Sequence, residues 1–146
     1  MEKYLKKYVM GPSIKMVNTA IERRINEQNA VYHLTQSQGL VVIYLADQTN
    51  YTATQTEIME LLGVAHTTTL NLLKSMERKG MIKIQKNPQD RRSNLVTLIW
   101  GDPSIYDQLN KNAEDNETTL LKGFTKTEIQ CFKDFLSRAY DNLMEG

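Results

Sequence analysis

The chain of 146 residues contains one cysteine and no long run of apolar residues. A single cysteine, Cys131, cannot form a disulfide within the chain, which fits a reducing compartment. The longest apolar run, residues 40–46, has seven residues, whereas a membrane-spanning helix needs about 20. The first twelve residues are basic but contain no signal-peptide core or cleavage site. We therefore expect a cytoplasmic protein that does not interact with a membrane.

The sequence also lacks the motifs of common enzyme classes. It has no glycine-rich loop for a phosphate, no nucleophile motif and no acid–base pair at a meaningful spacing. Its two histidines, His33 and His66, are distant in the sequence, and with one cysteine they give no recognisable metal-ligand cluster. We expect neither an enzyme nor a protein with a metal or another cofactor.

Charge is nearly balanced over the whole chain but is distributed unevenly. The formal net charge is +1, yet residues 74–92 hold seven basic and two acidic residues, whereas residues 101–146 hold five basic and nine acidic ones. A local positive field attracts phosphates even when the whole protein is nearly neutral. The alternative is an ordinary solvated face. The coincidence of this charge with the motif described next favours a nucleic acid as the partner.

The first half of the chain predicts helices. Apolar residues at spacings of three and four predict an amphipathic helix over residues 13–29, and the first nine residues suit a short helix of their own. Residues 40–46 have the composition of a buried strand. However, Thr35 and Gln38 fit a capping box, and the segment is long for a strand. A fully buried helix is therefore predicted.

Residues 54–80 carry the pattern of a helix-turn-helix. Thr54 and Glu57 fit a second capping box, and Gly63 can supply the positive φ of a tight turn between helices. The second helix is predicted over residues 65–79, and Gly80 then ends it.

The apolar period changes from 3.6 to 2 after this helix. Ile82 and Ile84 alternate with polar residues, and Val96 and Leu98 do so after a turn near residues 87–88. Residues 51–53 are candidates for a short third strand. A helix-turn-helix followed by a hairpin with a basic tip, called a wing, is suited to entering DNA grooves.

The C-terminal part predicts two more helices. Asp102 is a good N-cap for a helix over residues 103–122. Thr125 and Glu128 fit a third capping box, and Cys131 in the last helix is expected to be a small buried residue. A narrow apolar seam on that helix suggests packing against another helix, in the same or a second subunit. It comprises Ile129, Phe132, Leu136, Ala139 and Leu143.

The helix-turn-helix and the wing, at residues 63–82 and 87–98, resemble the MarR family of winged-helix transcription regulators. Asp90, Arg92, Val96 and Leu98 match the family pattern D-x-R-x-x-x-V-x-L. The resemblance covers nearly the whole chain and implies a mainly α fold with a small β-wing. It implies a single domain, 1–146, with a winged-helix lobe at 35–100 and dimerisation helices at 1–34 and 103–146. The chain departs from the family at Ala65, Thr69, Leu70, Ile99 and Trp100, which leaves its DNA target open.

The resemblance and the physics of DNA recognition together give candidate contacts. The major groove admits one helix, whose side chains can bond base edges, whereas Lys and Arg more often meet phosphates. The Arg92 side chain would enter the minor groove, with Asp90 bracing the loop; the alternative is a simple surface ion pair. The candidate DNA-binding residues are Gln55, His66, Thr67, Thr68, Asn71, Lys74, Arg78, Arg91 and Arg92.

The resemblance also implies partners. We expect a homodimeric repressor on a pseudo-palindromic double-stranded operator. A small aromatic or anionic effector is a further candidate partner, with Tyr32, His33 and Tyr44 as speculative contacts or, alternatively, core aromatic residues. Thiol sensing is not expected, because the N-terminal region has no cysteine. A winged-helix module that binds proteins and not DNA is the alternative function, although the basic wing argues against it.

Overall fold

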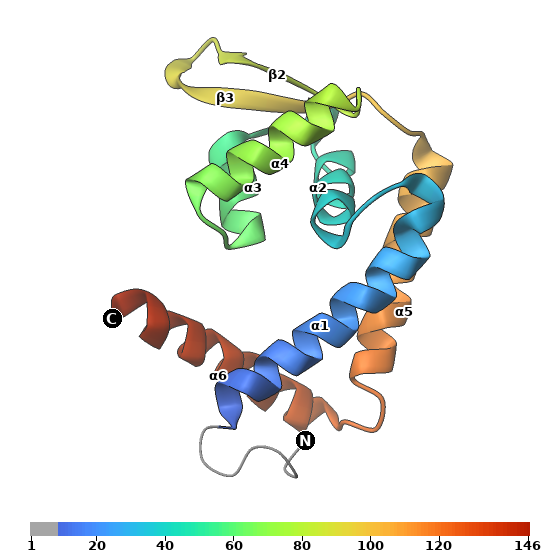
Figure 1. The fold of residues 1–146 in the computed structure, drawn as a ribbon, viewed down its shortest axis with the longest axis vertical. Helices are drawn as coiled ribbons and strands as arrows, with labels where there is room; N and C mark the ends of the chain where they lie inside the picture. The colour runs from blue at the N-terminus through green and yellow to red at the C-terminus, as the bar shows by residue number, and fades with distance from the viewer. Residues whose placement is uncertain (1–8) are drawn as a thin grey trace. The chain divides into compact units, whose positions relative to one another are not determined.

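The computed structural model describes residues 9–146, so all but the last residue of the N-terminal helix expected over residues 1–9 lies outside it. The described residues form six α-helices, two short 3-10 helices and one three-stranded antiparallel sheet (Figure 1), which confirms the predicted mainly α class. They fall into two compact units, one reaching to Ala113 and the other spanning Glu114–Gly146. The helices are α1 (Met10–Asn29), α2 (Gln36–Ala46), α3 (Gln55–Leu62), α4 (His66–Arg78), α5 (Pro103–Leu120) and α6 (Lys126–Glu145).

Three helices begin at the predicted capping boxes. At α2, the Thr35 hydroxyl accepts the Gln38 amide at 3.3 Å, and the Gln38 side chain accepts the Thr35 amide at 3.1 Å. The same reciprocal pair starts α3 and α6. Each box satisfies two backbone amides that a helix start would leave without partners. The prediction of a helix over the apolar run is confirmed, but α2 is not buried on every side, because Leu40 is exposed and Ile43 is half-buried.

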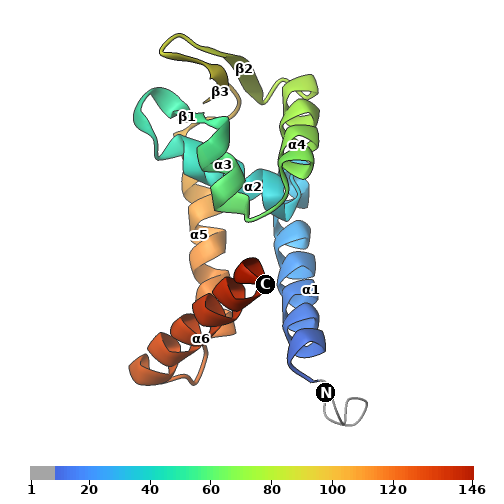
Figure 2. The ribbon, with the colours of Figure 1, turned by 90° about the vertical axis from the view of Figure 1, so that its left-hand side faces the viewer.

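The sheet has the order β1-β3-β2, with β1 (Thr52–Thr54), β2 (Ile82–Asn87) and β3 (Asp90–Leu98). Val96 lies at its centre, opposite Ala53 on one side and Ile84 on the other. The predicted hairpin is confirmed, and the third strand lies one residue later than expected. Figure 2 shows β2 and β3 extending from the lobe as a long hairpin.

The hydrophobic core lies beneath the sheet and is shared by every element from α2 to α5. Alternate residues of β2 and β3 point into it, as the period of two predicts. Helix α5 contributes Tyr106 and Leu109, so the core extends beyond the expected lobe of residues 35–100. The fully buried side chains include Val41, Val42, Leu45, Ile58, Leu73, Met76 and Val96.

The exit from β3 is fixed by close contact with a tyrosine ring. Gly101 has φ of 88°, and a Cβ there would lie 2.9 Å from the Tyr106 ring. The Tyr106 hydroxyl donates to the Trp100 carbonyl at 2.7 Å. Asp102 caps α5, as predicted, by accepting the Ser104 amide at 2.9 Å. Only glycine fits this turn without strain, because it needs a positive φ and no side chain.

Helix α6 has a large exposed apolar surface. Phe135 is 61% exposed and Leu143 is 82% exposed. Cys131 is exposed too, so the expectation that it is buried is wrong. The physical reason is that α6 has no buried residue, so even seam residues such as Leu136 are exposed. In the described part of the chain, no helix is both long enough and apolar enough to span a membrane.

Candidate nucleic-acid interface

Helix α4 is positioned by its buried face. Thr69, Leu73 and Met76 of this helix are fully buried against the core. The helix is one residue shorter at each end than predicted, and its N-cap, Ala65, provides no side-chain cap. The Thr69 hydroxyl donates to the Ala65 carbonyl at 3.3 Å. Packing of the inner face, without a polar cap, therefore holds the orientation of α4.

The opposite face of α4 is polar and exposed. Thr67, Asn71, Lys74 and Arg78 recur at steps of four, three and four, which places them along one side of the helix. The predicted residues that are exposed on this helix are His66, Thr67, Thr68, Asn71, Lys74 and Arg78. They offer hydrogen-bond donors and acceptors in the first two turns and two cations in the last two turns.

The wing presents arginine from a braced loop. The Asp90 carboxylate accepts the Arg92 backbone amide at 3.0 Å and the Arg92 Nε at 3.4 Å. The Arg92 side chain remains 94% exposed. Arg91 is exposed beside it. At the turn, the Asn87 side chain accepts the Gln89 amide at 3.0 Å, which fixes the tip. This geometry fits the bracing role predicted for Asp90 and also the alternative of a surface ion pair, because the exposed Arg92 guanidinium is paired with Asp90.

A hydrogen bond that the sequence did not reveal joins α4 to the wing. Glu77, near the end of α4, accepts the Ile84 backbone amide of β2 at 3.0 Å. Its acidic character in a basic segment is the only signal that could have drawn attention to it. Lys79 in turn donates to the His33 carbonyl at 3.5 Å and to the Gln38 side chain at 3.4 Å. One cation of the basic segment therefore connects α4 to the start of α2.

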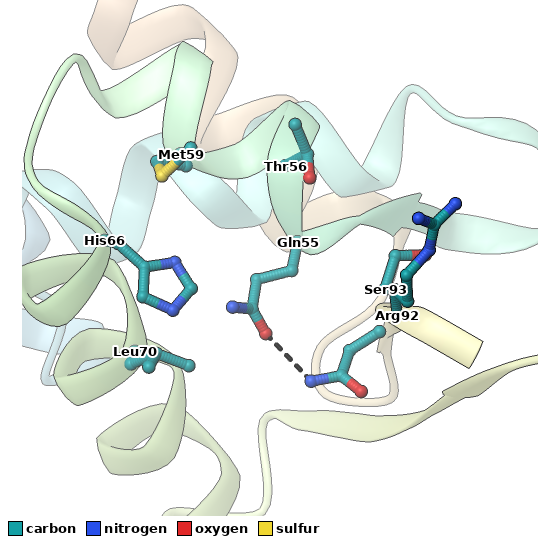
Figure 3. A pocket seen from close by; sticks show the side chains of 8 residues that line it. Gln55, Thr56, Met59, His66, Leu70, Arg92 and Ser93 are labelled. Atoms are coloured by element: carbon teal, nitrogen blue, oxygen red, sulfur yellow. Dashed lines mark hydrogen bonds between the residues drawn. The ribbon is translucent and has the colours of Figure 1, made fainter. Parts of the chain in front are cut away.

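Gln55 lies deeper than its predicted role suggests. Its side chain is 9% exposed, and its carbonyl oxygen accepts the Asn94 amide at 3.1 Å. Figure 3 shows the nitrogen of the Gln55 side-chain amide on the side of His66. These residues line a cavity of about 290 Å³ between α3, α4 and β3. The cavity is lined by Gln55, Thr56, Met59, His66, Leu70, Arg92, Ser93 and Asn94.

The three predicted effector contacts do not line this cavity. Tyr32 and Tyr44 pack against the hydrophobic core, and the Tyr32 ring meets the Trp100 ring edge-on at 6.4 Å. His33 is exposed, with φ of 57°. An effector site at these residues stays a prediction. Within residues 9–146, no three histidine, cysteine or acidic side chains come together as metal ligands.

Comparison with known proteins adds independent information. The model of the MarR family matches residues 33–93, from the turn before α2 to the first residues of β3. Over 87 residues, 60% of this chain, the sequence is 29% identical to YwaE of Bacillus subtilis, an uncharacterised HTH-type transcriptional regulator; the match spans only 51% of YwaE. Over 130 residues it is 26% identical to the multiple antibiotic resistance protein MarR of Escherichia coli, covering 88% of this chain and 89% of that protein.

Solved structures agree. A mutant E. coli MarR bound to operator DNA superposes with a TM-score of 0.72 at 26% identity, covering 89% of this chain and 92% of that one. BpsR of Bordetella bronchiseptica superposes with a TM-score of 0.76 at 17% identity, covering 94% and 97%, and shows likeness of fold. The wing pattern, the buried packing of α4 and these matches agree: the chain resembles the winged-helix transcription regulators of the MarR family, whose model matches residues 33–93.

Proposed function

We propose that this protein represses transcription by binding a pseudo-palindromic DNA operator as a homodimer. The observation that carries the proposal is the exposed polar face of α4 beside a wing whose Arg92 is braced by Asp90 and exposed to solvent. A helix of this kind fits a major groove, and an arginine on a hairpin fits the adjacent minor groove. In E. coli MarR, the same fold has been captured on operator DNA.

The residues of α4 divide into two groups by chemistry. Asn71 can form a bidentate pair with adenine, and Thr67 can bond a base edge or contact a thymine methyl. Lys74 and Arg78 carry full charges that suit phosphates, which fix register and not sequence. His66, Thr68 and Arg91 border these groups and complete the proposed contact surface. A protein-interaction module would not need two exposed arginines, Arg91 and Arg92, at the tip of its hairpin.

Exposed apolar residues support the homodimer. Helix α1 exposes Met10 and Ile14, and α6 exposes Phe135 and Leu143. Large exposed apolar side chains of this kind commonly mark a protein–protein interface. A two-fold dimer would present two copies of α4 to half-sites about one helical turn apart. A DNA target also supports the proposed cytoplasmic location of this regulator.

A small aromatic or anionic ligand is the proposed effector. A protein of the same fold, BpsR, is regulated in its DNA binding by 6-hydroxynicotinic acid. Tyr32, His33 and Tyr44 are the candidate contacts in this chain. A ligand that prefers one spacing of the two α4 helices would shift operator affinity by its difference in affinity for the two states.

The test is a genome-wide footprint with purified protein, followed by titration of the enriched site. Arg92→Ala should weaken operator binding and reduce its dependence on salt concentration, because fewer counterions are released. Arg23→Ala is the matched control, since Arg23 is equally an exposed arginine but lies on α1, beside Glu27. No enriched site, or identical salt slopes for Arg92→Ala and wild type, would contradict DNA recognition through the wing.

A further inference from the structure

Lys79, the C-cap residue of α4, lies away from the polar face of that helix. It follows the half-buried Leu72 by about two turns, so it lies on the side of Leu72 and about 100° around the helix from Arg78. Its Nζ donates to the His33 carbonyl at 3.5 Å and to Oε1 of Gln38 at 3.4 Å. The protein itself therefore uses this cation of the basic segment, which its neighbours on the polar face leave for DNA.

Both acceptors of Lys79 belong to the joint between the end of α1 and the start of α2. His33 has a positive φ of 57°, which is uncommon for a residue other than glycine. Lys79 therefore helps to hold a turn that the backbone alone disfavours. Gln38 is buried, and its Oε1 also accepts the Thr35 amide in the capping box of α2. The Lys79 ammonium thus bonds the same oxygen that starts α2.

The joint itself is tightly packed. The Asn26 side chain of α1 accepts the amide of Gln36, the first residue of α2, at 2.7 Å. Asn29 is buried, and a Cβ on Gly39 would lie 2.7 Å from its side-chain nitrogen. Helix α1 cannot turn against α2 without breaking this bond or this contact. Direct contacts therefore run from α1 through the start of α2 to the end of α4, all within the unit that reaches Ala113.

Apolar packing alone would fix α4 less precisely. Leu73 and Met76 hold it to the core, but the hydrophobic effect has no preferred direction, whereas hydrogen bonds from a charged donor do. At its other end α1 exposes Met10, Ile14 and Val17, which the proposed second copy would cover. The orientation of α4 relative to α1 would then set the distance between the two copies of α4.

We propose that Lys79 is a positioning residue that fixes α4 relative to α1 and thereby sets the half-site spacing that the dimer accepts. The proposal rests on the DNA-binding function proposed above and names a determinant of its specificity. One added base pair moves a half-site by about 3.4 Å and rotates it by about 35°. A dimer whose α4 helices are held by Lys79 cannot follow such a change, whereas a dimer without this bond can follow it in part.

The experiment measures affinity for the footprinted operator and for two versions with one base pair inserted or deleted between the half-sites. In the wild-type protein, each change of spacing should reduce affinity by about tenfold or more. In Lys79→Met, which keeps the apolar chain but has no donor, the reduction should be less than about threefold. Lys79→Arg keeps a charged donor and should restore most of the spacing penalty. Each ratio is taken within one protein, so a lower folded fraction cancels.

Lys74→Met is the matched comparison, because it makes the same substitution on the same helix at a proposed phosphate contact. It should weaken binding to all three operators similarly and reduce the dependence on salt concentration. Lys79→Met should leave that dependence unchanged, since Lys79 is bonded within the protein.

Two results would overturn the proposal while operator binding stands. One is a wild-type spacing penalty in Lys79→Met. The other is a weaker salt dependence in Lys79→Met like that of Lys74→Met, which would make Lys79 a phosphate contact. If the wild-type protein has no specific operator, the proposed function itself fails.

Discussion

Asn71 lies in the second turn of α4, on its exposed side, and carries the most informative base-reading chemistry of that face. Asn71→Ala removes one donor and one acceptor without touching the core. The variant should lose about 1–3 kcal/mol of binding free energy at one base position and tolerate other bases there. Affinity measured on operators varied at each position checks this. Arg78→Ala should instead weaken all operators similarly; a uniform loss for Asn71→Ala would contradict base reading.

Tyr106 makes the lobe sensitive to alkaline pH. Burial, more than the nearby Tyr51 and Asp102, raises the pKa of its phenol above the ordinary value. Below pH about 10 both folded and unfolded states keep the proton, so the stabilisation is complete. As pH rises through the raised pKa, the folded state must lose its proton at a cost, and the free energy of unfolding falls.

Denaturant unfolding between about pH 8 and pH 11 measures this effect. Tyr106→Phe is the matched variant, since it keeps the ring against Gly101 but loses the hydroxyl bonded to Trp100. It should be less stable than wild type at pH 8, and this difference should shrink as pH rises. A difference that is constant over the whole range would rule out titration of Tyr106 as its source.

At the residue scale, exposed polar positions were more predictable than buried ones. The outward face of α4 follows from helix periodicity alone, so Thr67 and Asn71 could be identified from spacing. Gln55 could not, because its burial depends on Asn94, which is 39 residues away in the sequence. Cys131 was wrongly expected to be buried because the expectation rested on its residue type, whereas α6 has no buried residue.

At the scale of elements, local chemistry fixed where helices begin. The capping boxes at Thr35, Thr54 and Thr125 act within four residues, so sequence alone locates them. Gly63 ends α3 and Gly80 follows α4, and both have the positive φ that was predicted for Gly63 and fits a C-terminal cap at Gly80. The link between α4 and β2 was not visible, because Glu77 bonds a backbone amide and a backbone amide has no sequence signature.

Glu77 should control how firmly the wing is held against α4. Glu77→Ala removes the acceptor of the Ile84 amide, so hydrogen exchange at that amide should become faster and operator affinity should fall as the wing loosens. Glu77→Gln removes the charge but keeps an oxygen acceptor, and it should retain most of the protection. This pair separates loss of the bond from loss of a negative charge near DNA.

Exchange at Ile84 is measured by NMR, and affinity by titration of the operator. The Lys83 amide neighbours it in β2 and serves as an internal reference. Equal exchange rates at Ile84 in wild type and Glu77→Ala would show that the bond does not hold the wing. Glu77→Gln behaving like Glu77→Ala would show that the charge, and not the acceptor, matters.

At the scale of the whole molecule, charge and apolar surface are segregated along the chain. Residues 74–92 concentrate positive charge on α4 and the wing, whereas the C-terminal 46 residues are acidic overall. Acidic helices would be repelled by DNA, which leaves them available for contacts between subunits. The order of helices and the wing were predictable because each pattern is local. The proposed second subunit would cover α6, and no local pattern specifies its geometry.

The homodimer should depend on the exposed seam of α6. Leu143→Asp places a charge where an apolar side chain is 82% exposed in one subunit, so a partner that covers it would be lost. Sedimentation at micromolar concentration should show a dimer for wild type and a monomer for this variant. Lys133→Asp changes charge at an exposed position off the seam and should remain dimeric. The exposed seam lies outside the hydrophobic core of the lobe, so the unfolding temperature of the monomeric variant should fall mainly because association is lost. The unfolding temperature of this variant should also vary less with protein concentration than that of wild type. Wild-type protein that sediments as a monomer, or a dimer that survives Leu143→Asp, would require a different surface to bring the two copies of α4 onto one operator.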